Sequence, residues 1–185
     1  MFRVLRRVAD RHRHANSQFG WLFQPYMGDE LIALAFADGG TQDAVDPLRV
    51  AAVCIRAGHC RPEGSLTLCL PADSWDALME WLNFIGNRPL VTWSAHRELS
   101  RLNLWLRPHL GFDLPNAVVD VARLYQRRQR YRHPQLERRP GFEEAARRLA
   151  VPEPETASPL CDKALATACM YRQLVQRDAP GWQGG

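Results

Sequence analysis

Apolar residues in this chain gather in short, bounded runs, and the longest run predicts a buried strand. Residues 31–40 read Leu-Ile-Ala-Leu-Ala-Phe-Ala-Asp-Gly-Gly, with no charge before Asp38 and a glycine pair at the end. Such a run is typical of a strand covered on both faces, as in α/β proteins. Because side chains alternate along a strand, one face carries Ile32, Leu34 and Phe36 and the other mainly alanines. The small face predicts another element lying over it.

The remaining pattern predicts further strands and a series of helices. Apolar or alternating runs predict strands at 48–56, 65–70, 90–93 and 116–120. Helical spacing and capping residues predict helices at 74–85, 95–110, 142–149 and 159–176, and one that Asp120 caps and that runs through Tyr125. The sequence therefore predicts an α/β fold with a mixed central sheet of about five strands flanked by helices.

The two ends of the chain differ from its middle. Residues 1–24 read as a basic amphipathic arm, either a solvated helix that packs a thin apolar stripe on the domain or a phosphate-binding segment. Residues 25–177 read as one domain, and residues 178–185 as a flexible, glycine-rich tail.

Composition narrows the class of protein. The chain has 185 residues, 46% hydrophobic and 24% charged, as expected for one soluble globular domain. No apolar run approaches the roughly 20 residues of a membrane span, and the N-terminus lacks a signal-peptide pattern, so we expect a cytoplasmic protein with no membrane contact. The five cysteines include no Cys-x-x-Cys pair, which argues against a disulfide framework or a zinc site. The net charge of +4 alone is weak support for a polyanionic partner.

One basic stretch has a composition that suits nucleic acid. Arg127, Arg128, Arg130 and Arg132 surround Tyr131, and a single-strand groove needs charge for phosphates and an aromatic face for bases. A mobile solvated loop has the same composition, so the sequence leaves both interpretations open. We expect residues 127–140 to be the least structured stretch of the domain.

Three segments carry a family resemblance. They are the strand run that ends in Gly39-Gly40, the stretch from Phe84-Ile-Gly-Asn-Arg-Pro-Leu-Val91 to Glu98, and Ser158-Pro-Leu-Cys-Asp-Lys-Ala-Leu-Ala-Thr-Ala168. With scaffold matches at 106–116 and 118–121, they resemble the DEDDh-type 3′→5′ exonucleases, which include the proofreading epsilon subunit of bacterial DNA polymerase III. The resemblance extends from about Phe19 to Val175 and implies a ribonuclease-H-like fold.

The resemblance also implies that the first two catalytic motifs are degenerate. Aligning Gly40 with the last glycine of the family's Asp-x-Glu-Thr-Thr-Gly places Ala35 at the Asp and Ala37 at the Glu. Glu98 then stands where the second motif has an Asp. We expect Ala35 and Ala37 to point into the position of the family's metal cleft, near Glu98.

The third motif has lost its chemistry in the same way. The family reads His-x-Ala-x-x-Asp-Ala, and the register places Ser158 at the general-base His and Lys163 at the metal-binding Asp. A shift of one residue puts Asp162 at the Asp but leaves Ala157 at the His. Lys163 in place of an anion predicts an ion pair with Glu98 instead of bound cations.

These substitutions predict a catalytically inactive member of a hydrolase family. Two-metal hydrolysis needs carboxylates to hold a pair of divalent cations, and alanine offers no ligand. We expect no cofactor, and a role in binding single-stranded nucleic acid or a protein. The alternative is an active 3′→5′ exonuclease in which Asp38, Glu98 and Asp162 hold Mg²⁺ or Mn²⁺ in a rearranged site. A third possibility is a purely structural subunit, and the oligomeric state is open.

Overall fold

A five-stranded mixed sheet forms the centre of the protein. The computed structural model describes residues 9–37, 47–56, 59–132, 141–152 and 158–176. The strands lie in the order β3-β2-β1-β4-β5, with bounds β1 Leu31–Ala37, β2 Leu48–Arg56, β3 His59–Leu70, β4 Leu90–Thr92 and β5 Val118–Asp120. The pairs β1·β2 and β2·β3 are antiparallel, whereas β1·β4 and β4·β5 are parallel. The sheet is the mixed one that the sequence predicts.

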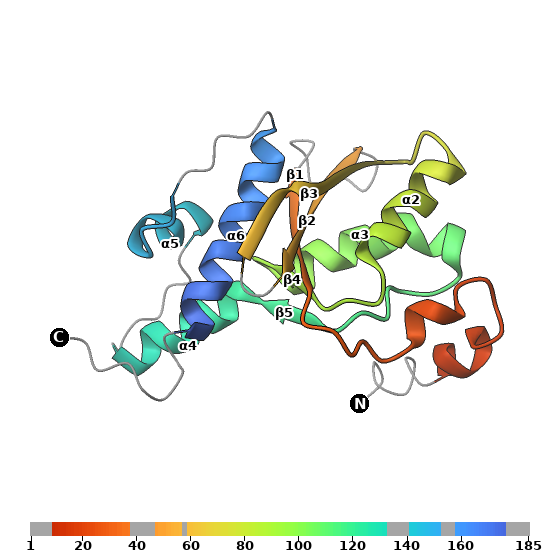
Figure 1. The fold of residues 1–185 in the computed structure, drawn as a ribbon, viewed down its shortest axis with the longest axis horizontal. Helices are drawn as coiled ribbons and strands as arrows, with labels where there is room; N and C mark the ends of the chain where they lie inside the picture. Colours follow the sequence, from red (N-terminus) through yellow and green to blue (C-terminus); the bar gives the residue numbers. More distant parts are fainter. Residues whose placement is uncertain (1–8, 38–46, 57–58, 133–140, 153–157, 177–185) are drawn as a thin grey trace.

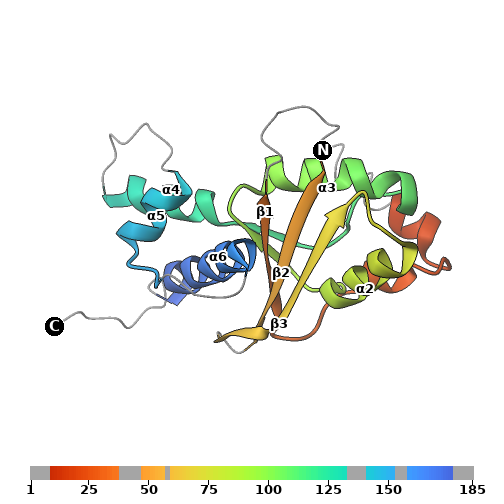
Figure 2. The same cartoon turned by 90° about the horizontal axis from the view of Figure 1, so that it is seen from above.

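Helices cover both faces of this sheet (Figures 1 and 2). Their bounds are α2 Trp75–Ile85, α3 Ala95–Leu110, α4 Val121–Arg132, α5 Phe142–Arg148 and α6 Pro159–Gln176. Helices α2 and α3 lie on one side of the strands, and α4, α5 and α6 lie on the other, with α6 directly over the sheet. The predicted order β-β-β-α-β-α-β-α-α-α is confirmed.

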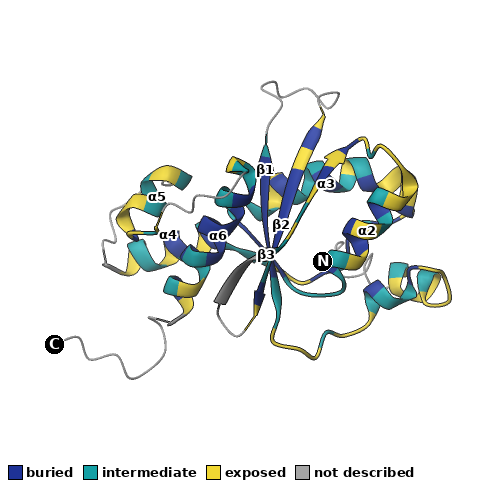
Figure 3. Ribbon diagram, turned by 45° about the horizontal axis from the view of Figure 1, so that its top comes forward, coloured by how far each residue is buried: buried dark blue, intermediate teal, exposed yellow. Residues whose placement is uncertain are grey.

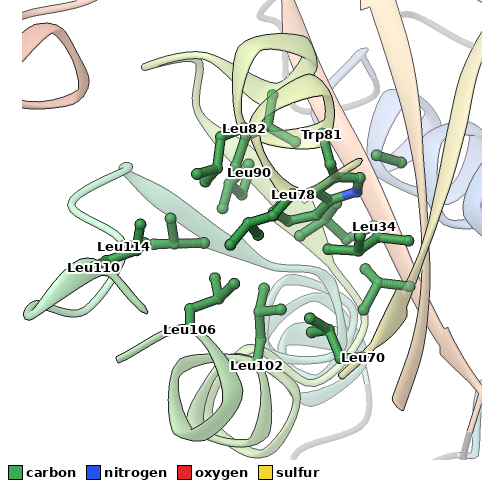
Figure 4. Close-up of a cluster of buried hydrophobic side chains, with 14 of the residues drawn as sticks. Leu34, Leu70, Leu78, Trp81, Leu82, Leu90, Leu102, Leu106, Leu110 and Leu114 are labelled. Carbon is green, nitrogen blue, oxygen red and sulfur yellow. The ribbon is translucent and has the colours of Figure 1, made fainter. Parts of the chain in front are cut away.

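Large side chains fill the space between the sheet and helices α2 and α3. Figure 4 shows Leu34 of β1 facing Trp81 of α2 and Leu102 of α3 within a cluster of leucines. All three side chains are almost fully buried. Each leucine of this kind contributes about 1.5–3 kcal/mol by leaving water.

The opposite face of the sheet is built from small side chains under α6. Ala35 and Ala51 pack with Ala164 of α6, and Ala33 packs with Ala168 one turn later. Figure 3 shows α6 buried where it meets the strands. The prediction that an element lies over the alanine face is confirmed.

The expectation that residues 127–140 form the least structured stretch is wrong for residues 127–132, which are helical. Helix α4 begins at Val121 and runs to Arg132, and residues 133–140 lie outside the described part. Asp120 Oδ1 accepts a hydrogen bond from the backbone N–H of Arg123 at 2.9 Å, so it caps the helix as predicted. Residues 126–132 have no helical pattern of apolar residues, but arginine and glutamine are good helix formers, so the helix extends beyond Tyr125.

The described part of the N-terminal arm lies against the domain. Residues 9–14 are helical, and a 3-10 turn spans Gly20–Phe23. The rings of His14 and Phe112 lie 4.7 Å apart, and those of Phe19 and Phe112 lie 5.8 Å apart. Among the described residues, no helix has the length and apolar character needed to cross a membrane.

Candidate functional site

A small pocket lies where β1, β2, α3 and α6 meet. Its cavity volume is about 20 Å³, it is partly open to solvent, and the described part of its lining is Phe36, Leu48, Arg97, Glu98, Arg101 and Lys163. Phe36 is near the carboxyl end of β1, and α3 begins just after the carboxyl end of the parallel strand β4. The crevice at the carboxyl ends of parallel strands is a common ligand site in open α/β sheets.

Glu98 is buried, and its carboxylate is engaged in holding the start of α3. Glu98 Oε2 accepts hydrogen bonds from the backbone N–H of Ser94, at 2.9 Å, and from the Thr92 hydroxyl. A negative charge in the first turn of a helix also interacts favourably with the helix dipole. The pocket's carboxylate therefore has a structural role in joining β4 to α3.

Lys163 reaches the pocket from the other side of the sheet. Its Nζ lies 3.4 Å from the Phe36 carbonyl oxygen, to which it donates a hydrogen bond. The same Nζ lies 5.5 Å from the centroid of the Phe142 ring, within the range of a cation–π contact. The expected Lys163–Glu98 ion pair is wrong: each group is held by other partners, and the two are not within ion-pair distance.

The two alanines at the family's first-motif positions do not line the pocket. Ala35 is only 2% exposed and packs against Cys161, Ala164 and Leu165 of α6. Ala37 is the last residue of β1 and is partly buried. The residue of β1 that lines the pocket is Phe36, between them.

The other residues that the sequence comparison singled out do not all lie at the pocket. Lys163, and not Asp162, lines the pocket, although both are on the first turns of α6. The Ser158 hydroxyl accepts a hydrogen bond from the Cys161 N–H at 3.5 Å, so it lies at the N-cap of α6. Asp38 lies outside the described residues.

The described part of the pocket lining does not fit a pair of divalent cations. It contributes three positively charged side chains, Arg97, Arg101 and Lys163, and one negatively charged side chain, Glu98. Mg²⁺ and Mn²⁺ take hard oxygen ligands, and neither ammonium nor guanidinium can supply them. Among the residues that the structure describes, no three His, Cys, Asp or Glu side chains group as a metal site.

A second charged feature is an exposed stripe along α4, which we call the α4 stripe and define as Arg123, Arg127, Arg130 and Tyr131. These positions share one helical face, at spacings of four, seven and eight residues from the first. The Tyr131 side chain is 91% exposed and that of Arg123 is 74% exposed. Arg128 is directed elsewhere, since its Nη1 donates a hydrogen bond to the Gln173 carbonyl of α6 at 3.4 Å.

Sequence reasoning singled out Arg128 and Arg132 with this stripe and missed Arg123. Arg132 ends α4, and its side chain lies outside the described part. The spacing from Arg123 to Arg127 is helical, so reading residues 127–132 as helix would have included Arg123. The pocket arginines Arg97 and Arg101 were also missed, and their four-residue spacing on the helix that carries Glu98 was the available signal.

The sheet order, with helices on both faces, is that of an α/β fold of the ribonuclease-H-like, exonuclease type. Among solved structures, the chain is similar to the crystal structure of cell-death related nuclease 4 (CRN-4), with a TM-score of 0.62 and 13% sequence identity. The match covers 82% of this chain and 65% of that chain. At this identity the likeness shows the fold alone. No protein-family model matches the chain, and no curated protein matches it in sequence.

Proposed function

We propose that this protein is a catalytically inactive relative of the exonucleases that binds single-stranded nucleic acid. The observation that carries the proposal is the described part of the pocket lining at the end of β1, where Arg97, Arg101 and Lys163 lie with one carboxylate. That carboxylate, of Glu98, is already engaged by Thr92 and Ser94. A site with this charge favours a bound anion over a bound cation.

The proposed loss of activity follows from the chemistry of phosphodiester hydrolysis. The two-metal mechanism uses one cation to generate the attacking hydroxide and both to stabilise charge on the transferred phosphate. Basic side chains stabilise that charge but do not hold a metal-bound water. We therefore expect no hydrolysis of DNA or RNA with Mg²⁺ or Mn²⁺ present.

The α4 stripe is the surface that we propose contacts the strand. Its residues extend over about 12 Å, at about 1.5 Å per residue of helix. Arginines at this spacing neutralise successive phosphates and release condensed counterions. Tyr131 offers an exposed ring on which a base stacks, a contact worth about 1–3 kcal/mol.

The test is fluorescence anisotropy of a labelled single-stranded oligonucleotide and of a duplex of the same length, in EDTA and over a range of salt. We expect single-strand affinity to fall steeply with salt. Tyr131→Ala should weaken single-strand binding about 5- to 150-fold and affect the duplex less, because paired bases have no free face. Arg127→Gln should reduce the salt dependence, whereas Arg147→Gln, which removes an exposed arginine from α5, should leave it unchanged.

Two outcomes would overturn parts of this proposal. If Tyr131→Ala and Arg127→Gln both bind like the unmodified protein, the α4 stripe is not the contact surface. If the unmodified protein binds no oligonucleotide at low salt, the nucleic-acid function falls and a protein partner becomes the better candidate.

A further inference from the structure

We infer that the protein forms a homodimer in which strand β3 of one copy pairs with β3 of a second copy, antiparallel and about a two-fold axis through Thr67. The inference concerns the assembly of the protein and goes beyond the proposed binding of nucleic acid. It assigns an occupant to one edge of the central sheet, where the described part of the chain places no further strand.

The β3 edge is long, and half of it lacks the usual protection against pairing. Strand β3 has 12 residues, and β2 is its neighbour on one side. A free edge strand presents N–H and C=O groups that template another strand, and proteins commonly block such edges with charged residues, with proline or by keeping them very short. The first half of β3 contains Arg61, Pro62 and Glu63, whereas Ser65–Leu70 has no charge and no proline. We therefore assign the pairing to Ser65–Leu70.

The opposite edge of the sheet explains why the assembly closes at two copies. Its strand, β5, has only three residues, and a very short edge strand resists pairing. A two-fold contact uses the same surface on both copies, so it leaves no β3 edge free for a third. Helix α4 follows β5 at the edge away from β3 (Figure 1), so each copy of the dimer keeps its α4 stripe exposed.

The two faces of β3 carry different side chains. The Thr67 hydroxyl lies 3.8 Å from Cys161 Sγ of α6, and the alternate residues Ser65, Thr67 and Cys69 are exposed. Leu68 points to the other face and belongs to the cluster of large side chains that α2 and α3 cover. A two-fold axis normal to the sheet keeps each face on the same side. Small polar residues of one copy therefore meet small polar residues of the other, and leucines meet leucines.

An axis through Thr67 gives the register in which this segment best matches itself. Thr67 then lies opposite Thr67 of the second copy, and Leu66 lies opposite Leu68. The exposed Ser65 lies opposite Cys69. Opposed threonines are a favourable cross-strand pair, and like charges directly opposite each other are unfavourable. The net charge of +4 comes from other parts of the chain, so this register brings no like charges together along Ser65–Leu70.

The first experiment measures mass by size-exclusion chromatography with light scattering, in reducing buffer and over a range of protein concentration. We expect a mass of about twice the 21.1 kDa of one chain. Thr67→Lys places two ammonium groups opposite each other at the axis and should return the mass to that of one chain. Val118→Lys is the matched control, because it adds the same charge at an exposed position of the other edge strand and should keep the dimer.

The second experiment tests the register by cross-linking, without adding charge to the strand. The Cβ atoms of directly opposed residues lie about 5 Å apart, whereas an offset of four residues separates two positions by about 14 Å along the strand. In a Cys69→Ser background, Thr67→Cys should therefore join two copies through a short bis-maleimide. Ser65→Cys, which this register places opposite position 69, should not. The Cys69→Ser protein alone is the blank.

The outcomes decide the assembly without reference to nucleic acid. The mass of one chain at every concentration overturns the dimer. A dimer that survives Thr67→Lys, or that is lost equally in Val118→Lys, overturns the pairing through β3, as does the absence of cross-linking in Thr67→Cys. Circular dichroism checks that Thr67→Lys is folded; if it is not, the cross-linking pair decides. Oligonucleotide binding enters none of these measurements, so failure of the dimer and failure of the proposed function are distinguishable.

Discussion

The two faces of strand β1 are packed in different ways, although alternate residues of one seven-residue strand make both. On one face, Leu34 joins Trp81 and the other large side chains between the sheet and helices α2 and α3 (Figure 4). On the other face, Ala33 and Ala35 meet alanines of α6. Large side chains stabilise the first face by burying a large apolar area. On the second face, the small side chains let α6 pack close to the sheet.

The small face suits an alanine at position 35 better than it suits a carboxylate. A carboxylate at position 35 needs metal ions or water as partners, whereas an alanine there fills its space against Cys161 and Ala164. Near the carboxyl end of the same strand, the Lys163 side chain of α6 donates a hydrogen bond to the Phe36 carbonyl oxygen. Small apolar side chains therefore pack beneath α6, whereas charged side chains lie in the described lining of the pocket.

The largest effect should come from returning an acid to the alanine face. Ala35→Asp places a carboxylate at a position that is 2% exposed and surrounded by apolar side chains, and an uncompensated buried charge costs about 3–5 kcal/mol. Urea unfolding measures this loss. Burial raises the pKa of the introduced carboxyl group, so the loss should grow as the pH rises above the ordinary aspartate pKa of about 3.9.

Ala37→Asp is the control for this variant, because Ala37 is at the partly exposed end of the same strand. It should cost much less than Ala35→Asp. An Ala35→Asp protein that is as stable as the parent, or that gains stability with Mn²⁺, would contradict the packing role assigned to Ala35.

The next largest effect should come from exchanging the sizes of neighbouring side chains. Leu34→Ala leaves a cavity in the leucine cluster and should lower the free energy of unfolding by about 2–5 kcal/mol. Ala35→Leu adds volume under α6 and should cost about 1–3 kcal/mol through overpacking. Denaturant unfolding of the two variants tests the contrast directly. If Ala35→Leu stabilises the protein, the approach of α6 to the sheet is not close.

A smaller effect is expected at the start of α3. Glu98→Ala leaves the Ser94 N–H and the Thr92 hydroxyl without their acceptor, at a cost of about 1–3 kcal/mol. Glu98→Gln keeps an acceptor oxygen and should cost less. Thermal unfolding gives the comparison, and equal losses for the two variants would show that the charge, and not the hydrogen bonds, stabilises this junction.

The strands were predictable where the apolar pattern covers the whole strand. They were less predictable where only pairing with a neighbouring strand extends the strand beyond that pattern. Strand β3 begins at His59, although the sequence predicts a start near Ser65. Residues 61–64 include a proline and a glycine, which are disfavoured inside strands, yet β2 pairs on both sides of them around an irregularity between Val53 and Ile55. Because β3 is an edge strand, a proline there leaves no central ladder bond unmade.

The candidate site was predictable only in part, because its groups come from distant segments. The motif comparison identified Glu98 and Lys163, and the structure places both on one pocket. Arg97 and Arg101 join them only through the packing of α3 and α6 against the same strand end. Spacing along a helix shows that two residues share a face, but it does not show which other helix that face approaches.

The central claim is that the pocket at the end of β1 does not hold a pair of divalent cations. Isothermal titration of Mn²⁺ into the protein, with a single-stranded oligonucleotide present, tests it most directly. We predict no saturable uptake of Mn²⁺ and no shortening of the oligonucleotide. Uptake of about two Mn²⁺ per chain, lost in Glu98→Gln and accompanied by cleavage, would contradict the claim.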